Sequence, residues 1–280
     1  MREIHVNDII TNIKEMCVEA THFLSADMAA CLRQARNSET DPTGQQVLAQ
    51  LEENLAIAGE QMIPICQDTG MAVVFVDIGQ EAVCVGGSLE EAINEGVRQG
   101  YREGYLRNSI VGDPLLRENT GDNTPAVIHY HIVPGDKLTL TLAPKGFGSE
   151  NVSRLFMLKP SDGREGVINA VLTAVREGGE NACPPLVVGV GIGGTFEKCA
   201  YLAKYALTRL VNTVSPFPHI REMEEELLAK INDLGIGPGG LGGQNTALKV
   251  SIETYPTHIA GLPVAVNICC HANRHCTRVL

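Results

Sequence analysis

Tryptophan is absent from the 280-residue sequence, and only six phenylalanines and six tyrosines are present. Aromatic side chains therefore cannot supply most of the core, which must rest on aliphatic residues. Acidic residues outnumber basic residues, since the chain has 33 Asp and Glu but only 22 Lys and Arg. The formal net charge is −11. Nucleic acid or an anionic membrane surface would require a basic face, so neither partner is expected. A local group of arginines can still bind a small anionic substrate.

No apolar run of about 18 residues occurs, so no membrane-spanning helix is expected. The N-terminal stretch carries charges among its apolar residues and lacks a small-residue cleavage site, which argues against a secretory signal. We therefore expect a cytoplasmic protein. The hydrophobic fraction of 44% and the charged fraction of 20% are ordinary for a globular chain and argue against disorder.

The order of periodic segments predicts an α/β fold. Residues 1 to about 62 read as three helices, of which Asn7 and Ser25 cap the first two and Pro42 opens the third. Beyond them, β-branched apolar runs alternate with amphipathic helices and glycine-rich turns. Neither a repeat nor a linker interrupts this pattern. We expect one domain over residues 1–280, a mixed sheet flanked by helices with a helical N-terminal layer.

The expected strands cover residues 71–77, 126–132, 137–142, 186–190, 247–253 and 264–268. The expected later helices cover residues 89–105, 165–177, 196–207 and 219–234. A capping box at 88–91 marks the start of the first of these helices. The turn at 133–136 is expected to join its two flanking strands as a hairpin-like unit.

Nine cysteines in a chain of this size need an explanation. Their number is odd and export is not expected, so a disulfide framework is a poor interpretation. Three of them, Cys66, Cys183 and Cys270, stand in loops at the ends of expected strands, where a rigid sheet presents ligands. By contrast, Cys17, Cys31 and Cys199 fall within helical segments with mainly apolar neighbours, in which a small buried residue is the usual role.

The spacing of the three loop cysteines does not by itself identify a metal site. They lie too far apart in the sequence for a zinc ribbon or zinc knuckle, and they lack the local spacing of ferredoxins. From spacing alone, cysteines that merely pack are the more frequent case.

The motifs around these cysteines are more specific. In order along the chain they are Pro64-Ile-Cys-Gln-Asp-Thr-Gly70, Asn119-Thr-Gly121, Lys145-Gly-Phe-Gly-Ser-Glu-Asn151, Ala182-Cys-Pro-Pro185, Gly191-Ile-Gly-Gly-Thr195 and Cys270-His-Ala-Asn-Arg274. Together they resemble the class I, iron–sulfur fumarases and the related L(+)-tartrate dehydratases. The resemblance runs from about Asn7 to the C-terminus and matches the separate α subunit of the two-subunit members.

This resemblance implies that Cys66, Cys183 and Cys270 ligate three irons of a [4Fe–4S] cluster. Cys269 is an alternative to Cys270, which we prefer because it directly precedes His-Ala-Asn-Arg. The fourth iron would have no protein ligand and could bind a small dicarboxylate as a Lewis acid.

The resemblance also implies functional side chains. The catalytic candidates are Asp68, Gln67 and His258, and the substrate-binding candidates are Arg107, Gly146 and Gly148. Each has a simpler role open to it, because an Asp can cap a turn, a loop Arg can be a solvated charge, a Gly can shape a turn and a lone His can be structural. Lys145 and Arg274 are further candidates.

The expected function is the reversible hydration of fumarate to (S)-malate, at an active site shared with a β subunit in an (αβ)2 assembly. The near alternative is the α subunit of an L(+)-tartrate dehydratase. A different class stays open, in which a non-catalytic chain uses its cysteines for structural zinc or for packing. A phosphate-binding transferase built on the Gly191–Thr195 turn is a third candidate, although the phosphate-loop signature is absent.

Overall fold

A computed structural model describes all 280 residues, and the chain forms two compact units. The first unit comprises Met1–Ser25, Leu55–Phe147 and Arg274–Leu280, and the second comprises Ala26–Asn54 and Gly148–Asn273. Each unit has its own four-stranded sheet. The single domain expected over residues 1–280 therefore contains two compact units, which are described separately.

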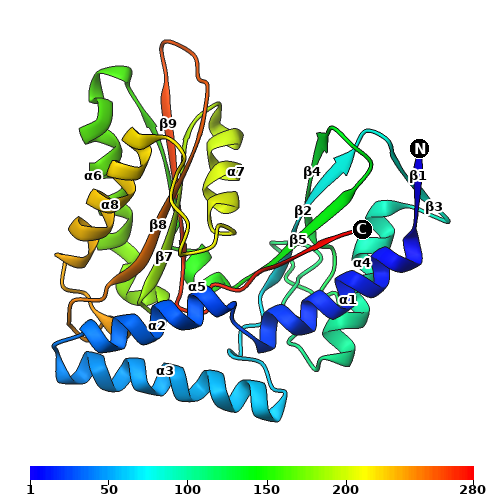
Figure 1. Cartoon of the computed structure of the whole chain (residues 1–280), viewed down its shortest axis with the longest axis horizontal. Helices are drawn as coiled ribbons and strands as arrows, with labels where there is room; N and C mark the ends of the chain where they lie inside the picture. The colour runs from blue at the N-terminus through cyan, green and yellow to red at the C-terminus, as the bar shows by residue number, and fades with distance from the viewer. The chain divides into compact units, whose positions relative to one another are not determined.

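The first unit contains a sheet in the order β10-β5-β2-β4 (Figure 1). Its strands are β10 (Cys276–Val279), β5 (Leu138–Lys145), β2 (Met71–Gly79) and β4 (Val127–Val133). β2 runs parallel to β4 and antiparallel to β5, so the sheet is mixed, as expected. A short parallel pair, β1 (Arg2–His5) and β3 (Ala82–Val85), stands apart from this sheet.

The expected hairpin-like unit around the turn at 133–136 is wrong. β4 and β5 do not pair with each other, because β2 lies between them and pairs with both. The reason is visible in the burial of β2, whose residues 72–76 are all buried. A strand that is apolar on both faces takes a central place in a sheet, whereas β4 exposes much of its length and stays at the edge.

Two helices, α1 (Val6–His22) and α4 (Leu89–Glu103), contribute to the core of the first unit with residues of β2 and β5. Glycines in α4 permit this close packing, because a Cβ at Gly96 would lie 2.7 Å from the Cβ of Ile13. Ser88 caps α4 as expected and accepts a 3.4 Å hydrogen bond from the Glu91 amide. The expected cap of α1 is wrong, because His5 occupies that position and its Nδ1 accepts from the amide of Asn7.

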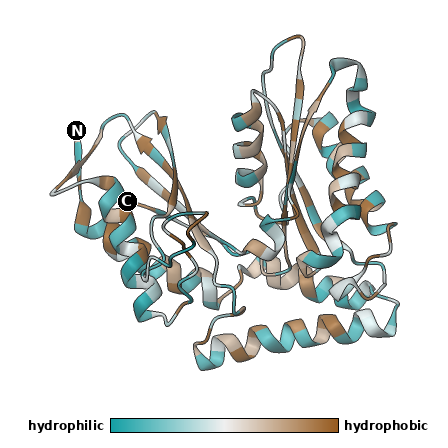
Figure 2. Cartoon of the chain, turned by 180° about the vertical axis from the view of Figure 1, so that it is seen from behind, coloured by the Kyte–Doolittle hydropathy of each residue, from teal (hydrophilic) through white to brown (hydrophobic).

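The second unit contains a sheet in the order β6-β9-β7-β8. These strands are β6 (Arg154–Leu158), β9 (Leu262–Cys269), β7 (Leu186–Gly193) and β8 (Ala247–Tyr255). Helices α6 (Gly163–Gly178) and α8 (Pro218–Asn232) cover one face, and α7 (Phe196–Ala206) covers the other (Figure 1). The strands of this sheet are largely apolar along their length (Figure 2), as expected for strands buried on both faces.

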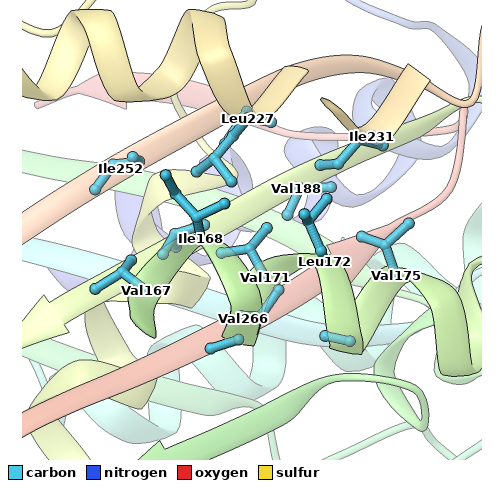
Figure 3. Close-up of a cluster of buried hydrophobic side chains, with 14 of the residues drawn as sticks. Val167, Ile168, Val171, Leu172, Val175, Val188, Leu227, Ile231, Ile252 and Val266 are labelled. Carbon is cyan, nitrogen blue, oxygen red and sulfur yellow. The ribbon is translucent and has the colours of Figure 1, made fainter. Parts of the chain in front are cut away.

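Aliphatic side chains fill the space between this sheet and helices α6 and α8, which fits the scarcity of aromatic residues. Figure 3 shows residues such as Val171 of α6, Leu227 of α8 and Val188 of β7 meeting in this core. On the opposite face, α7 lies directly on β7, because Cβ atoms at Gly189 and Gly191 would come within 2.2 and 2.0 Å of α7 carbonyl oxygens. Glycine is required at both positions for this close approach.

The N-terminal helices are completed by α2 (Ala26–Ser38) and α3 (Pro42–Gln61). Short elements fill several turns, namely α5 (Phe147–Glu150), η1 (Pro160–Asp162), η2 (Gly179–Ala182) and η3 (Pro238–Gly240). The expected α/β fold with mixed sheets and N-terminal helices is confirmed, although β1, β3, β6 and β10 were not among the expected strands. None of the helices is both long and apolar enough to cross a membrane.

Candidate active site

The loop between α3 and β2 carries Cys66, Gln67 and Asp68, and neighbours in the first unit fix its backbone. The hydroxyl of Tyr101 is directed to the carbonyl oxygens of Thr69 and Gly70, at 3.0 and 2.9 Å. The Nδ2 of Asn123 also donates to the Gly70 carbonyl, at 3.2 Å. Tyr101 and Asn123 are themselves buried, and burial raises the pKa of the Tyr101 hydroxyl. Neutral groups therefore hold the end of the loop formed by Thr69 and Gly70.

Both carboxylate oxygens of Asp68 accept hydrogen bonds from backbone amides. Gly70 donates to Oδ1 at 3.0 Å, which is the turn-capping role expected of such an Asp. Phe147 donates to Oδ2 at 2.9 Å from the end of β5. The carboxylate is half-buried and oriented from two sides.

Gly146 lies directly beside this carboxylate. A Cβ at Gly146 would lie 3.0 Å from Oδ2 of Asp68, which is closer than a side chain tolerates without a shift. Glycine at this position therefore lets the backbone approach the acidic group. The structure brings together these two predicted site residues in the first unit.

Arg107 joins the same group through both its backbone and its side chain. Its amide donates to Oγ1 of Thr69 at 2.9 Å, and its Nη1 donates to Oε1 of Gln67 in a longer bond of 3.4 Å. Both side chains are exposed. An exposed guanidinium beside a carboxamide can take a carboxylate from solution with little desolvation. Four predicted residues, namely Gln67, Asp68, Arg107 and Gly146, are thus neighbours.

Arg274 contacts the same loop from the C-terminal segment. Its Nη2 donates to the carbonyl oxygen of Asp68 at 2.8 Å, and the residue is only 4% exposed. Sequence reasoning named Arg274 only as a further candidate and did not name Tyr101 or Asn123. Tyr101 falls within the helix expected over residues 89–105, and nothing in the sequence marks its hydroxyl as an anchor.

Cys183 and Cys270 lie at one end of the sheet of the second unit. Cys183 precedes β7 and Cys270 follows β9, and because these strands are antiparallel the two loops meet. The amide of His271 lies 3.4 Å and its Nδ1 lies 3.0 Å from the carbonyl oxygen of Cys183. Since a carbonyl oxygen only accepts, Nδ1 carries the proton. The backbone of Cys183 has φ 54°, a left-handed conformation that is uncommon for a residue with a side chain and clusters at functional sites.

The neighbouring cysteines differ in their surroundings. Cys269 is the last residue of β9 and is buried, whereas Cys270 begins the loop and is half-buried. Cys183 is exposed and Cys66 is half-buried. Burial raises the pKa of the thiols of Cys17 and Cys199, and raises that of Cys276 to about 12. Thiols that resist ionisation are poor metal ligands, which argues against these three cysteines as ligands.

The remaining predicted residues lie elsewhere in the second unit. Gly148 sits in α5, and a Cβ there would meet no atom within 4 Å, so no close approach requires glycine. His258 is exposed in the loop between β8 and β9, and its Nδ1 accepts from the amide of Ala260. This loop and Cys270 lie at opposite ends of β9, and eight strand residues span about 26 Å.

The predicted cysteines are divided between the units, because Cys66 belongs to the first and Cys183 and Cys270 belong to the second. Neither unit by itself gathers three His, Cys, Asp or Glu side chains that could hold a metal ion.

Comparison with known proteins identifies the family. The family model described as Fumarate hydratase (Fumerase) matches residues 10–279. A protein of Methanocaldococcus jannaschii named "Putative L(+)-tartrate dehydratase subunit alpha" is 40% identical over 278 residues, which cover 96% of this chain and 95% of that protein. The L(+)-tartrate dehydratase subunit alpha of Escherichia coli K12 is 30% identical over 284 residues, covering 99% and 93%. The chain therefore belongs to the fumarate hydratase family of hydro-lyases.

Proposed function

We propose that this chain is the α subunit of a hydro-lyase that converts fumarate to (S)-malate and back. The observation that carries the proposal is the convergence of Gln67, Asp68, Arg107 and Gly146 around the loop that also holds Cys66. This group combines a proton-transferring carboxylate with donors for a substrate carboxylate, which are the two functions that hydration of a dicarboxylate needs from side chains.

The role of each side chain follows from its contacts. The Arg107 guanidinium, beside the Gln67 amide, binds a substrate carboxylate with paired N–H donors. Asp68 takes or returns the proton on the carbon next to that carboxylate, and its two amide partners hold the acceptor oxygens in place. The missing side chain at Gly146 keeps room beside the Asp68 oxygen. Gly148 is a weaker candidate, because its surroundings are open.

The proposed cofactor is a [4Fe–4S] cluster held by Cys66, Cys183 and Cys270. The donor set fits, because all three thiols lie in loops and none is fully buried. When bound, such a cluster supplies a Lewis-acidic iron that stabilises the negative charge on the substrate hydroxyl.

The proposed partner is a β subunit, because the relatives are named as alpha subunits. We propose that the two chains form an (αβ)2 assembly with an active site completed by β. Such an assembly holds two copies of this chain, which bears on His258. Because His258 lies at the end of the sheet opposite Cys183 and Cys270, we propose that it serves the site of the second copy.

L(+)-tartrate is a second candidate substrate, and the names of the relatives favour it. Tartrate shares both carboxylates with malate and carries one more hydroxyl, so the group around Asp68 suits either. The deciding experiment is co-expression with the β partner and anaerobic purification, followed by iron and sulfide analysis and by assays with fumarate and with L(+)-tartrate. A colourless protein that acts on neither compound would favour a non-catalytic chain with structural zinc or packed cysteines.

A further inference from the structure

Arg274 is a buried cation with most of its hydrogen-bonding capacity unused. Its side chain is almost completely buried, and one donor, Nη2, is bound to the carbonyl of Asp68. Its Nε and Nη1 atoms are also buried, and neither has a hydrogen-bond partner. A guanidinium carries five N–H groups, so three of them, one on Nε and two on Nη1, have no acceptor.

Burying these N–H groups is unfavourable unless a hydrogen-bond acceptor lies beside them. A buried N–H without an acceptor loses its hydration without compensation, and a buried unpaired charge costs several times more. The carboxylate of Asp68 accepts the amides of Gly70 and Phe147, but neither of its oxygens accepts from Nε or Nη1 of Arg274. The N–H groups on Nε and Nη1 of Arg274 therefore need an anionic acceptor from outside the chain.

Residue 146 places no side chain between Arg274 and Asp68, because it is a glycine. A Cβ at Gly146 would lie 3.7 Å from Nη2 of Arg274 and 3.0 Å from Oδ2 of Asp68. The glycine thus removes a side chain from the place where the cation and the carboxylate approach each other. A positive group next to Asp68 also lowers the electrostatic penalty for a second anion entering the site.

We propose that Arg274 is a substrate-binding residue that donates its free N–H groups to one carboxylate of the dicarboxylate, while Arg107 takes the other. This inference rests on the proposed function, because it adds a second carboxylate contact to the same site. A planar acceptor with two oxygens matches the planar array of donors on a guanidinium. The two arginines contact different atoms of the loop. Arg107 donates to the side chain of Gln67, and Arg274 donates to the backbone carbonyl of Asp68.

The test measures binding of succinate and of butyrate to the complex with the β subunit. Succinate has two carboxylates and butyrate has one, and neither can be hydrated or dehydrated. The variant Arg274→Lys keeps the positive charge and one donor for the Asp68 carbonyl but loses the planar array. The control is Arg33→Lys, an exposed position on α2 in the second unit.

We expect Arg274→Lys to weaken succinate binding about tenfold or more, the loss typical of one charge-assisted contact. The preference of the wild-type complex for succinate over butyrate should shrink by a similar factor, while iron content and melting temperature stay unchanged. Arg33→Lys should bind both compounds as the wild type does.

Two results overturn the proposal. One is a wild-type complex that shows no saturable binding of succinate. The other is an Arg274→Lys variant that keeps the wild-type preference for succinate, whether both ligands bind normally or both are weakened equally. The latter pattern would assign Arg274 to holding the Asp68 loop through bound water. Succinate binding does not depend on turnover, so failure of the fumarate and tartrate assays would sink the proposed function without deciding this test.

Discussion

The backbone amide of Phe147 donates a 2.9 Å hydrogen bond to Oδ2 of Asp68, and this bond connects the end of β5 to the loop before β2. The two segments meet because of strand register, since Met71 at the start of β2 pairs with Lys145 at the end of β5. Pairing of the two strands therefore places the acidic group against Gly146 and Phe147. The predicted catalytic carboxylate is positioned by the sheet itself.

Replacing Asp68 with Asn tests this carboxylate. Asn keeps a similar shape but offers only one acceptor oxygen, so it cannot satisfy both amides or take a proton. We expect kcat of the complex to fall about 100-fold or more, the usual contribution of a general acid or base. The matched control is Asp77→Asn on β2, a partly exposed carboxylate that contacts His131. If Asp68→Asn kept the kcat of the wild type, Asp68 would not be the proton-transferring group.

Single Cys→Ser changes at Cys66, Cys183 and Cys270 test the proposed ligand set. A serine hydroxyl is not ionised at neutral pH and binds iron weakly, so each variant should lose iron and acid-labile sulfide after anaerobic purification. Cys199→Ser is the control, because that residue belongs to the buried face of α7 and is fully buried. Comparing Cys269→Ser with Cys270→Ser shows which of these two adjacent cysteines is the third ligand of the cluster. Loss of the cluster in the first but not the second would assign the role to Cys269.

Mixed assemblies test whether His258 serves the second copy. Cys66→Ser and His258→Asn should each abolish turnover when present in both copies. When the two variants are co-expressed with different affinity tags, the hybrid contains one site with intact cysteines and an intact histidine from the neighbour. We expect the hybrid to recover up to about half of wild-type activity, because one of its two sites is complete. An inactive hybrid would place His258 in the site of its own chain, whereas an active assembly with His258→Asn in both copies would place it outside catalysis.

Glu39 predicts a pH dependence of stability. Its carboxylate links α2 to the segment before β8, because it accepts from the amides of Gln244 and Asn245 and from Nδ2 of Asn245. Burial alone raises the pKa of Glu39, but these bonds and the one from the amide of Asp41 outweigh it and lower the pKa from 4.5 to about 2. The stabilisation is therefore complete above about pH 4.5 and disappears as the pH falls towards 2.

Glu39→Gln should lower the free energy of unfolding at pH 7 by about 2–3 kcal/mol, measured by urea denaturation. The difference from the wild type should shrink as the pH falls from about 4.5 towards 2. Glu60→Gln, at an exposed position near the end of α3, is the control and should change stability little at either pH. If Glu39→Gln lowered the free energy of unfolding equally at pH 7 and near pH 2, the charge of the carboxylate would not be the stabilising feature.

Local features of the sequence predicted many of the elements correctly. The capping residue Ser88 and the apolar period behind it marked the start of α4, and the β-branched run from Met71 marked β2. The strands β1, β3 and β10 were missed because each has only four residues, too few to show a period. β6 was missed although it has five, because it lies between a glycine-rich loop and a proline turn.

The amino-acid sequence by itself determined the α/β class, the family and the residues that belong to its motifs, because these depend on residue types and on order along the chain. Only the tertiary structure decided that β2 separates β4 from β5, that Asp68 meets Phe147 and Arg274, and that His258 lies at the far end of its sheet from Cys270. The reason is that a strand's partner and a side chain's neighbours come from segments distant in sequence. Burial and strand register select those partners, and no local pattern records them.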